Sequence, residues 1–80
     1  MFEDIKSALF KGDRNAVAQA TKAALDSGAD IRKILNEGLI SAMEEMGRRF
    51  KANEVFIPEV LISAKAMHAG LAVQIGRAHV

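Results

Sequence analysis

The clearest helical pattern in the chain lies in residues 31–50, IRKILNEGLISAMEEMGRRF. Apolar side chains recur there every three or four residues, the spacing that places them on one face of an α-helix. The other positions carry most of the charges, as expected for a helix with one face against a core and one in water. The apolar face comprises Ile31, Ile34, Leu35, Leu39, Ala42, Met43, Met46 and Phe50.

Two Gly-x-Asp or Gly-Asp signals divide the chain before this helix. Gly12 and Gly28 suit the left-handed backbone that ends a helix without a Cβ clash. Asp13 and Asp30 suit the N-cap position, where a carboxylate accepts a hydrogen bond from the first turn of the next helix. The helices expected from these signals are residues 1–11, 14–27 and 31–50.

A fourth helix is expected to begin at Pro58, because the first turn of a helix does not use the N–H that proline lacks. Asn53 tolerates a left-handed backbone and ends the third helix. The apolar stripe of the fourth helix comprises Val60, Leu61, Ala64, Met67 and Leu71. Four helices with short connections predict an all-α fold, a compact four-helix bundle.

The composition excludes several classes of function. Eighty residues make one small domain, and 11 basic against 10 acidic residues give a net charge of +1, too small a field to attract nucleic acid or an anionic membrane. No apolar run approaches the roughly 20 residues of a membrane span, and the N-terminus carries no signal-peptide pattern. The absence of cysteine excludes disulfides and thiolate metal sites. We therefore expect a cytoplasmic protein.

The last six residues, IGRAHV (75–80), differ in character from the rest of the chain. Gly76 interrupts the helical stripe, and the string resembles the in-frame translation of a common DNA-sequencing adapter. We expect a helical domain over residues 1–74 followed by a non-native or truncated tail over residues 75–80, with the natural protein continuing. A frayed native C-terminus is the alternative.

Residues with catalytic chemistry are nearly absent. His68 and His79 are the only histidines, and no carboxylate stands at metal-pair spacing from His68, which we interpret as a polar residue on a helix flank. Glu44 and Glu45 point about 100° apart on a helix, so they cannot share a substrate as acid and base. The three methionines Met43, Met46 and Met67 are interpreted as core filler. We expect no catalytic residue and no metal ligand.

The connection between the third and fourth helices, FKANEVFIPEV (50–60), is unusually apolar for a turn. One interpretation is that this end of the bundle is covered by a flat, apolar group. The other is that Phe50 and Phe56 plug the open end of the bundle. The residues alone leave both open.

A family resemblance rests on this region. NEGLI (36–40), Met43, GRRF (47–50), FIPEVL (56–61) and SA (63–64) resemble the helical cap domain of cobalamin-dependent methionine synthase and of the corrinoid proteins of methanol and methylamine methyltransferase systems. The resemblance covers residues 1 to about 74. In that family the cap precedes a corrinoid-binding Rossmann-like domain, and methyltransferase subunits are its partners. The resemblance therefore implies a cap that shields methylcobalamin during methyl transfer and is not catalytic alone.

The resemblance also assigns roles to individual residues. Phe50, Ile57 and Val60 occupy the positions whose side chains lie over the upper face of the corrin in such caps. Gly38 and Gly47 would be close-packing positions between helices. We expect the three apolar residues to form one surface cluster with Phe50 the most exposed, while Phe56 and Leu61 point into the core.

Two other functions are kept as alternatives. Light-sensing cobalamin regulators resemble this chain but carry tryptophan in place of Phe50 and a Glu-His pair in place of Val60 and Leu61, which favours the methyl-carrier branch. A plain helical protein-interaction module is the second. The Asp-x-His-x-x-Gly loop whose histidine ligates cobalt from below is missing from the chain, so cobalamin contact would involve the upper face only. We expect these 80 residues alone to bind cobalamin weakly or not at all.

Overall fold

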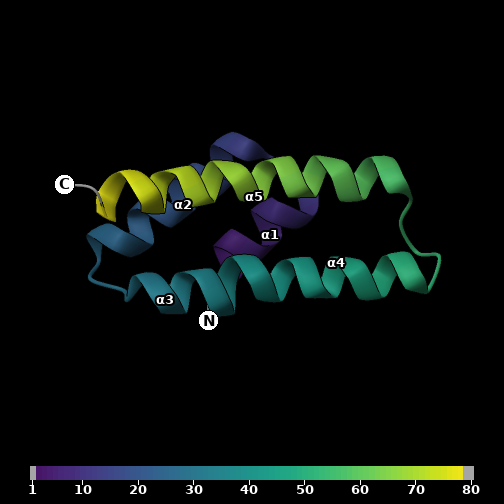
Figure 1. Ribbon diagram of the computed structural model, residues 1–80, viewed down its shortest axis with the longest axis horizontal. Helices are drawn as coiled ribbons and strands as arrows, with labels where there is room; N and C mark the ends of the chain where they lie inside the picture. Colours follow the sequence, from purple (N-terminus) through teal and green to yellow (C-terminus); the bar gives the residue numbers. More distant parts are fainter. Residues whose placement is uncertain (1, 79–80) are drawn as a thin grey trace.

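The computed structural model describes residues 2–78 and confirms an all-α four-helix arrangement (Figure 1). The third helix is continuous in space but contains a π-helical middle segment, so it carries three labels. The elements are α1 Glu3–Lys11, α2 Arg14–Asp26, α3 Ile31–Lys33, η1 Ile34–Ile40, α4 Ser41–Lys51 and α5 Ile57–Ala78. Among the described residues, none of these helices is long and apolar enough to cross a membrane.

The helix boundaries follow the local signals in the sequence. Asp13 Oδ1 accepts a hydrogen bond of 3.0 Å from the N–H of Ala16, and Asp30 Oδ1 accepts one of 2.7 Å from the N–H of Arg32. Gly12 ends α1 with a left-handed φ of 71°. The two aspartate caps and the glycine stop are therefore confirmed.

The π-helical segment η1 was not anticipated from the sequence. A π-helix places more residues in each turn than an α-helix, so residues before η1 are rotated relative to those after it. Ile34 is fully buried, as expected from its place on the predicted apolar face, whereas Ile31, in the first turn before η1, is exposed. Gly38 lies inside this segment, and a Cβ there would stand 3.5 Å from side-chain atoms of Ile5 and Phe2. Its predicted role as a contact between helices is confirmed.

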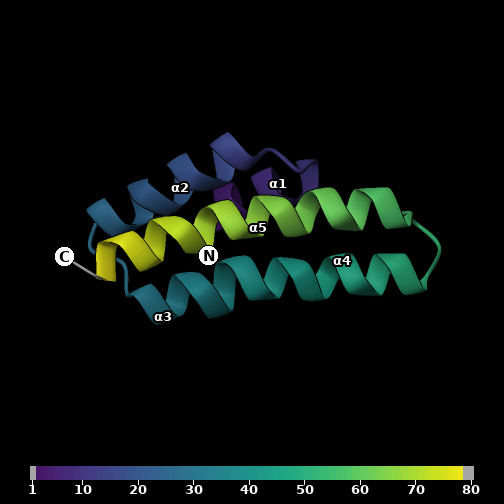
Figure 2. The ribbon, with the colours of Figure 1, turned by 45° about the horizontal axis from the view of Figure 1, so that its top comes forward.

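Helix α5 packs along α2 and α1 through small and polar residues (Figure 2). The fully buried positions of α5 are Ser63, Ala66, Gly70 and Gln74. A Cβ at Gly70 would lie only 3.0 Å from Leu39 and from Val17, so the glycine permits this close approach.

The two polar side chains among these buried positions, Ser63 and Gln74, each donate a hydrogen bond. The Ser63 hydroxyl donates a 2.8 Å hydrogen bond to the carbonyl oxygen of Leu9 in α1. The Gln74 side-chain amide donates one of 3.3 Å to the carbonyl oxygen of Ile31. These bonds tie α5 to the start of the third helix and to the end of α1.

The hydrophobic stripe predicted for α5 is correct only in part. Met67 and Leu71 are half-buried against the core, but Leu61 is exposed. Helical periodicity places Leu61 almost opposite Ser63, Ala66 and Gly70. Because these small residues form the face that packs against α2, Leu61 is left exposed. Close backbone approach therefore outweighs the burial of one large side chain.

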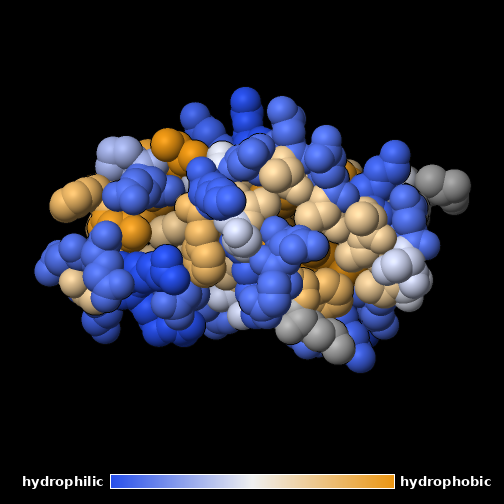
Figure 3. Space-filling view, turned by 180° about the vertical axis from the view of Figure 1, so that it is seen from behind, coloured by the Kyte–Doolittle hydropathy of each residue, from blue (hydrophilic) through white to orange (hydrophobic). Residues whose placement is uncertain are grey.

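The core lies between α1, α2, the third helix and the inner face of α5, and comprises Ile5, Ala8, Leu9, Val17, Ile34, Leu39, Ala42, Met46 and Ala66. Met46 is buried and Met43 and Met67 pack against this cluster, which confirms them as core residues. Figure 3 shows the molecule from behind, where hydrophilic side chains surround smaller apolar areas. Helix α5 continues past Gly76 to Ala78, and residues 79 and 80 of the expected tail lie outside the described residues.

Candidate functional site

The three residues singled out by the resemblance lie at one end of the bundle. α4 and α5 run side by side in opposite directions and are joined by residues 52–56 (Figures 1 and 2). Phe50 is in the last turn of α4, Ile57 is the first residue of α5, and Val60 follows one turn later. Phe50 and Ile57 are exposed and Val60 is half-buried.

Backbone hydrogen bonds define the connection between these helices. The N–H of Glu54 donates to the carbonyl oxygen of Arg49 at 2.8 Å, and Asn53 adopts the left-handed φ of 64° expected of it. At the start of α5, Glu59 Oε1 accepts a 2.9 Å hydrogen bond from the N–H of Phe56. The turn is thus held by its backbone and by a capping carboxylate, which leaves its apolar side chains free to face outward.

The predicted exposures at this end are wrong in two respects. Phe56 is 68% exposed and Leu61 57%, although both were expected in the core. Phe50, expected to be the most exposed large apolar residue, is 44% exposed, less than Ile57 at 60%. Phe56 precedes the first turn of α5, where no other element covers it. The exposures also contradict the alternative in which Phe50 and Phe56 plug the bundle.

Gly47 also departs from its expected role. It lies in the middle of α4, one turn before Phe50, and is exposed; a Cβ added to it would meet nothing within 4 Å. A glycine inside a helix costs about 1 kcal/mol relative to alanine, and no neighbour in the described chain explains it. At Gly47, one turn before Phe50, no side chain covers the α4 backbone.

A compact charge cluster occupies another part of α4. Arg48 Nε donates to Glu45 Oε1 at 2.9 Å, and Arg49 Nε donates to Glu45 Oε2 at 3.3 Å. The hydrogen bonds from Arg48 and then Arg49 lower the pKa of the Glu45 carboxyl below its ordinary value. The Arg49 guanidinium also lies 4.4 Å from the ring centre of Phe10. The carboxylate balances one of the two guanidinium charges, and Glu45 is thereby engaged as a structural partner.

The end of the bundle that carries Phe50 and Ile57 exposes apolar side chains beside charged ones such as Glu54 and Glu59. Within residues 2–78, no group of three or more histidine, aspartate or glutamate side chains could hold a metal ion. His68 is exposed on α5, in keeping with its interpretation as a flank residue. The exposed apolar side chains at this end can pack against an apolar group.

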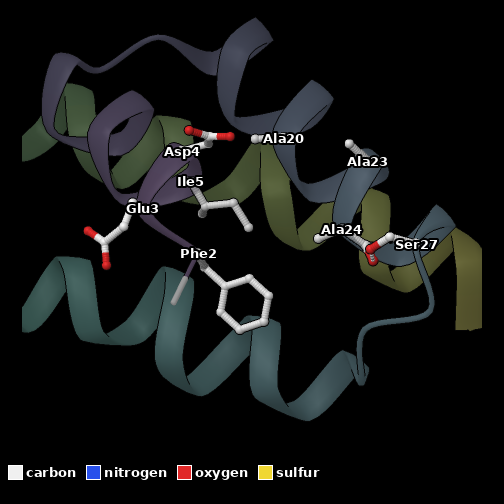
Figure 4. A pocket seen from close by; sticks show the side chains of 8 residues that line it. All are labelled: Phe2, Glu3, Asp4, Ile5, Ala20, Ala23, Ala24 and Ser27. Carbon is white, nitrogen blue, oxygen red and sulfur yellow. Dashed lines mark hydrogen bonds between the residues drawn. The ribbon is translucent and has the colours of Figure 1, made fainter.

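A separate hollow of about 360 Å³ lies between the start of α1 and α2 (Figure 4). It is open to solvent, and its lining comprises Phe2, Glu3, Asp4, Ile5, Ala20, Ala23, Ala24 and Ser27. Figure 4 shows the side chains of Glu3 and Asp4 pointing to different sides instead of converging. The hollow lacks the convergent polar groups typical of a binding site.

Comparison with known protein families identifies the family of the chain. A family model described as "B12 binding domain" matches residues 1–74. The chain belongs to this family. The resemblance to the helical cap domain of corrinoid proteins is thereby confirmed.

Individual relatives of this B12-binding domain are longer proteins. A corrinoid protein of Desulfitobacterium hafniense is 34% identical over 73 residues, which cover 91% of this chain and 34% of the relative. Monomethylamine corrinoid protein 1 of Methanosarcina acetivorans is 36% identical over 73 residues, with the same shares covered. The chain thus spans about a third of the length of these relatives.

A solved structure shares the fold. The crystal structure of the methanol:cobalamin methyltransferase complex MtaBC from Methanosarcina barkeri matches with a TM-score of 0.89 and 26% sequence identity. The match covers 95% of this chain and 30% of the other. The helical arrangement of this B12-binding domain therefore occurs within a corrinoid methyltransferase system.

Proposed function

We propose that residues 1–74 are the cap of a corrinoid protein and shield the upper face of methylcobalamin during methyl transfer between methyltransferase partners. The observation that carries this proposal is the position of Phe50, Ile57 and Val60 at one solvent-accessible end of a B12-binding domain. In this proposal the three side chains contact the corrin from above.

The chemistry of these side chains suits such a role. The corrinoid supplies a cobalt centre that carries the methyl group. Aromatic and aliphatic side chains above it exclude water and oxidants, and they form no hydrogen bond that would have to break when the cap moves away. Burial of each side chain stabilises the closed cap by about 1.5–3 kcal/mol, which is small enough for the cap to open again.

The remaining parts of the machinery would come from other polypeptide segments. A Rossmann-like corrinoid-binding domain would hold most of the cofactor and provide the lower cobalt ligand, since the chain lacks the Asp-x-His-x-x-Gly loop. Methyltransferase subunits would deliver and accept the methyl group. In this proposal the chain itself covers the upper face of the corrin and contributes no catalytic group.

The test is a chimaera in which residues 1–74 replace the matching N-terminal part of the Desulfitobacterium hafniense relative. Phe50→Ala should leave the melting temperature of the cap nearly unchanged, because Phe50 is already exposed, and should accelerate oxidation of the reduced cobalt severalfold by visible absorbance. Ile31→Ala, at the other end of the bundle, is the control and should have no effect on oxidation. Equal oxidation rates in all three proteins would contradict the proposed cap.

A further inference from the structure

The third helix buries two residues whose spacing does not fit an α-helix. Ile34 and Leu39 are both 0% exposed, and they are five residues apart. On an α-helix they would point about 140° apart, so one side of the helix could not carry both. The π-helical segment η1, Ile34–Ile40, joins residues five apart by hydrogen bonds and brings them nearly into line. η1 is therefore what allows both side chains to enter the core.

The residue next to Ile34 offers a second way to fill the same space. On an α-helix, Leu35 would point within about 40° of Leu39 and so lie on the buried face. In the structure Leu35 is half-buried and packs against the core. Exchange of isoleucine for leucine is among the changes that a core tolerates best. A third helix that is α-helical throughout would thus bury Leu35 in place of Ile34.

The first turn of the third helix can rotate without disturbing the core. Helix α3, Ile31–Lys33, has only exposed residues. Gly28, in the connection from α2, has a φ of 93° and an empty surrounding, since a Cβ there would meet nothing within 4 Å. The hydrogen bond of Asp30 to the N–H of Arg32 lies within the same turn and would rotate with it. Rotation of α3 therefore takes no side chain of that turn out of the core.

One described hydrogen bond opposes this rotation. The side-chain amide of Gln74, 4% exposed, donates to the carbonyl oxygen of Ile31 at 3.3 Å. This carbonyl would turn away from α5 together with α3, so the bond belongs to the observed register. Gln74 is also the last residue of the range that the family model matches. The register of the third helix is thereby tied to the end of the domain.

We propose that the third helix is a conformational switch with two registers. In the π register, Ile34 is in the core and Gln74 holds α3; in the α register, η1 becomes α-helical and Leu35 replaces Ile34. Loss of the Gln74 hydrogen bond favours the α register. The slip occurs at the end of the third helix away from Phe50 (Figure 1) and involves no cobalamin, so it stands or falls independently of the proposed cap.

Thiol labelling tests the slip, since the chain has no cysteine of its own. Ile34→Cys and Leu39→Cys are matched variants, because both positions are 0% exposed, but only residue 34 leaves the core in the α register. Residue 34 should be labelled at least about tenfold faster, as expected if a minor state of about 0.1–10% exposes it. Its rate should also change little in low urea, because the slip exposes little surface. Equal rates with equal urea dependence at both positions would overturn the proposal.

A second substitution tests the role of Gln74. Gln74→Leu removes the hydrogen bond to Ile31 and keeps a side chain of similar size. Added to each cysteine variant, it should raise the labelling rate of residue 34 relative to residue 39 by about five- to tenfold, the usual effect of one hydrogen bond. An unchanged ratio would show that Gln74 does not hold the π register.

A deletion separates the slip from fraying at the start of the helix. Glu37 is an exposed residue of η1. Without it, Ile34 and Leu39 are four residues apart, a spacing at which an α-helix can bury both. The deletion variant should therefore fold, with a Tm at or above that of the wild type by circular dichroism, and Ile34→Cys in it should be labelled as slowly as Leu39→Cys. Fast labelling that survives the deletion would assign the exposure to fraying, and an unfolded deletion variant would contradict the two registers; either result removes the proposal.

Discussion

Gly70 tests how closely α5 is held to the core, because the same substitution can be made at a second helical glycine with opposite surroundings. A Cβ at Gly70 would lie 3.0 Å from both Leu39 Cδ2 and Val17 Cγ1, whereas one at Gly47 would meet nothing within 4 Å. Leu39 and Val17 are fully buried, so they have little free space into which to move. Gly70→Ala and Gly47→Ala therefore share the change in helix propensity and differ in packing.

The magnitudes follow from these two contributions. Alanine stabilises a helix over glycine by about 1 kcal/mol, and this gain should appear in full at Gly47. Overpacking a core costs about 1–3 kcal/mol, which at Gly70 offsets or exceeds the gain. We expect the free energies of unfolding of the two variants to differ by about 1–3 kcal/mol, with Gly47→Ala above the wild type. Each kcal/mol corresponds to about 4–8 °C in Tm for a domain of this size.

The measurement is urea and thermal unfolding followed by far-UV circular dichroism. The urea dependence of the unfolding free energy should be unchanged, which would confirm that the variants unfold from equally compact states. Equal stability of the two variants would refute the argument, because it would mean that α5 can move away from the core at no cost.

Other predictions concern single interactions. Ser63→Ala should lower the free energy of unfolding by about 0.5–1.5 kcal/mol in chemical denaturation, since it removes a buried hydrogen bond while the Leu9 carbonyl still accepts the N–H of Gly12, whereas Thr21→Val should cost little because the buried Thr21 hydroxyl has no partner. Gly12→Ala should lower Tm, since its φ of 71° is left-handed and its Cβ would collide with a side chain of α5; an unchanged Tm would show that the turn can rearrange. The pKa of Glu45 is lowered, so its contribution to stability is present above the unfolded-state pKa and is lost as pH falls through the folded-state pKa. Unfolding curves of the wild type and Glu45→Gln should therefore differ at neutral pH and converge in acid; a gap that persists in acid would assign the effect to another cause.

Local signals predicted most of the helix boundaries, because each depends on a few adjacent residues. Asp13 and Asp30 cap helices wherever the following residues are helical, and Gly12 and Asn53 supply left-handed backbone at low cost. The end of the bundle that carries Phe50 and Ile57 was also located correctly. Chain connectivity alone brings the end of one helix to the start of the next.

The orientation of the helices about their own axes could not be read from the same signals. No residue type in the π-helical segment announces its wider turn, and Ile31, just before it, is exposed although it was expected on the apolar face. On α5, the apolar character of Leu61 predicted that it would be buried. The small side chains of Ser63 and Gly70 instead determined the face that approaches α2. Both outcomes depend on contacts with residues distant in the sequence. The expected burial of Leu61 was wrong for the same reason, whereas Phe56 is exposed because it precedes α5 and no other element covers it.

The placement of small residues inside and large ones outside on α5 has a consequence for mutational tolerance. In a saturation scan of the isolated chain, Ala66 and Gly70 should reject larger hydrophobic residues that most cores would accept. Leu61 and Ile57 should accept polar residues that most apolar positions would refuse. A substitution score that equates hydrophobicity with constraint would rank these four positions in nearly the reverse order. On this helix, the space left by the neighbouring helices limits side-chain volume at the inner face, whereas the exposed outer face of the isolated chain sets no such limit.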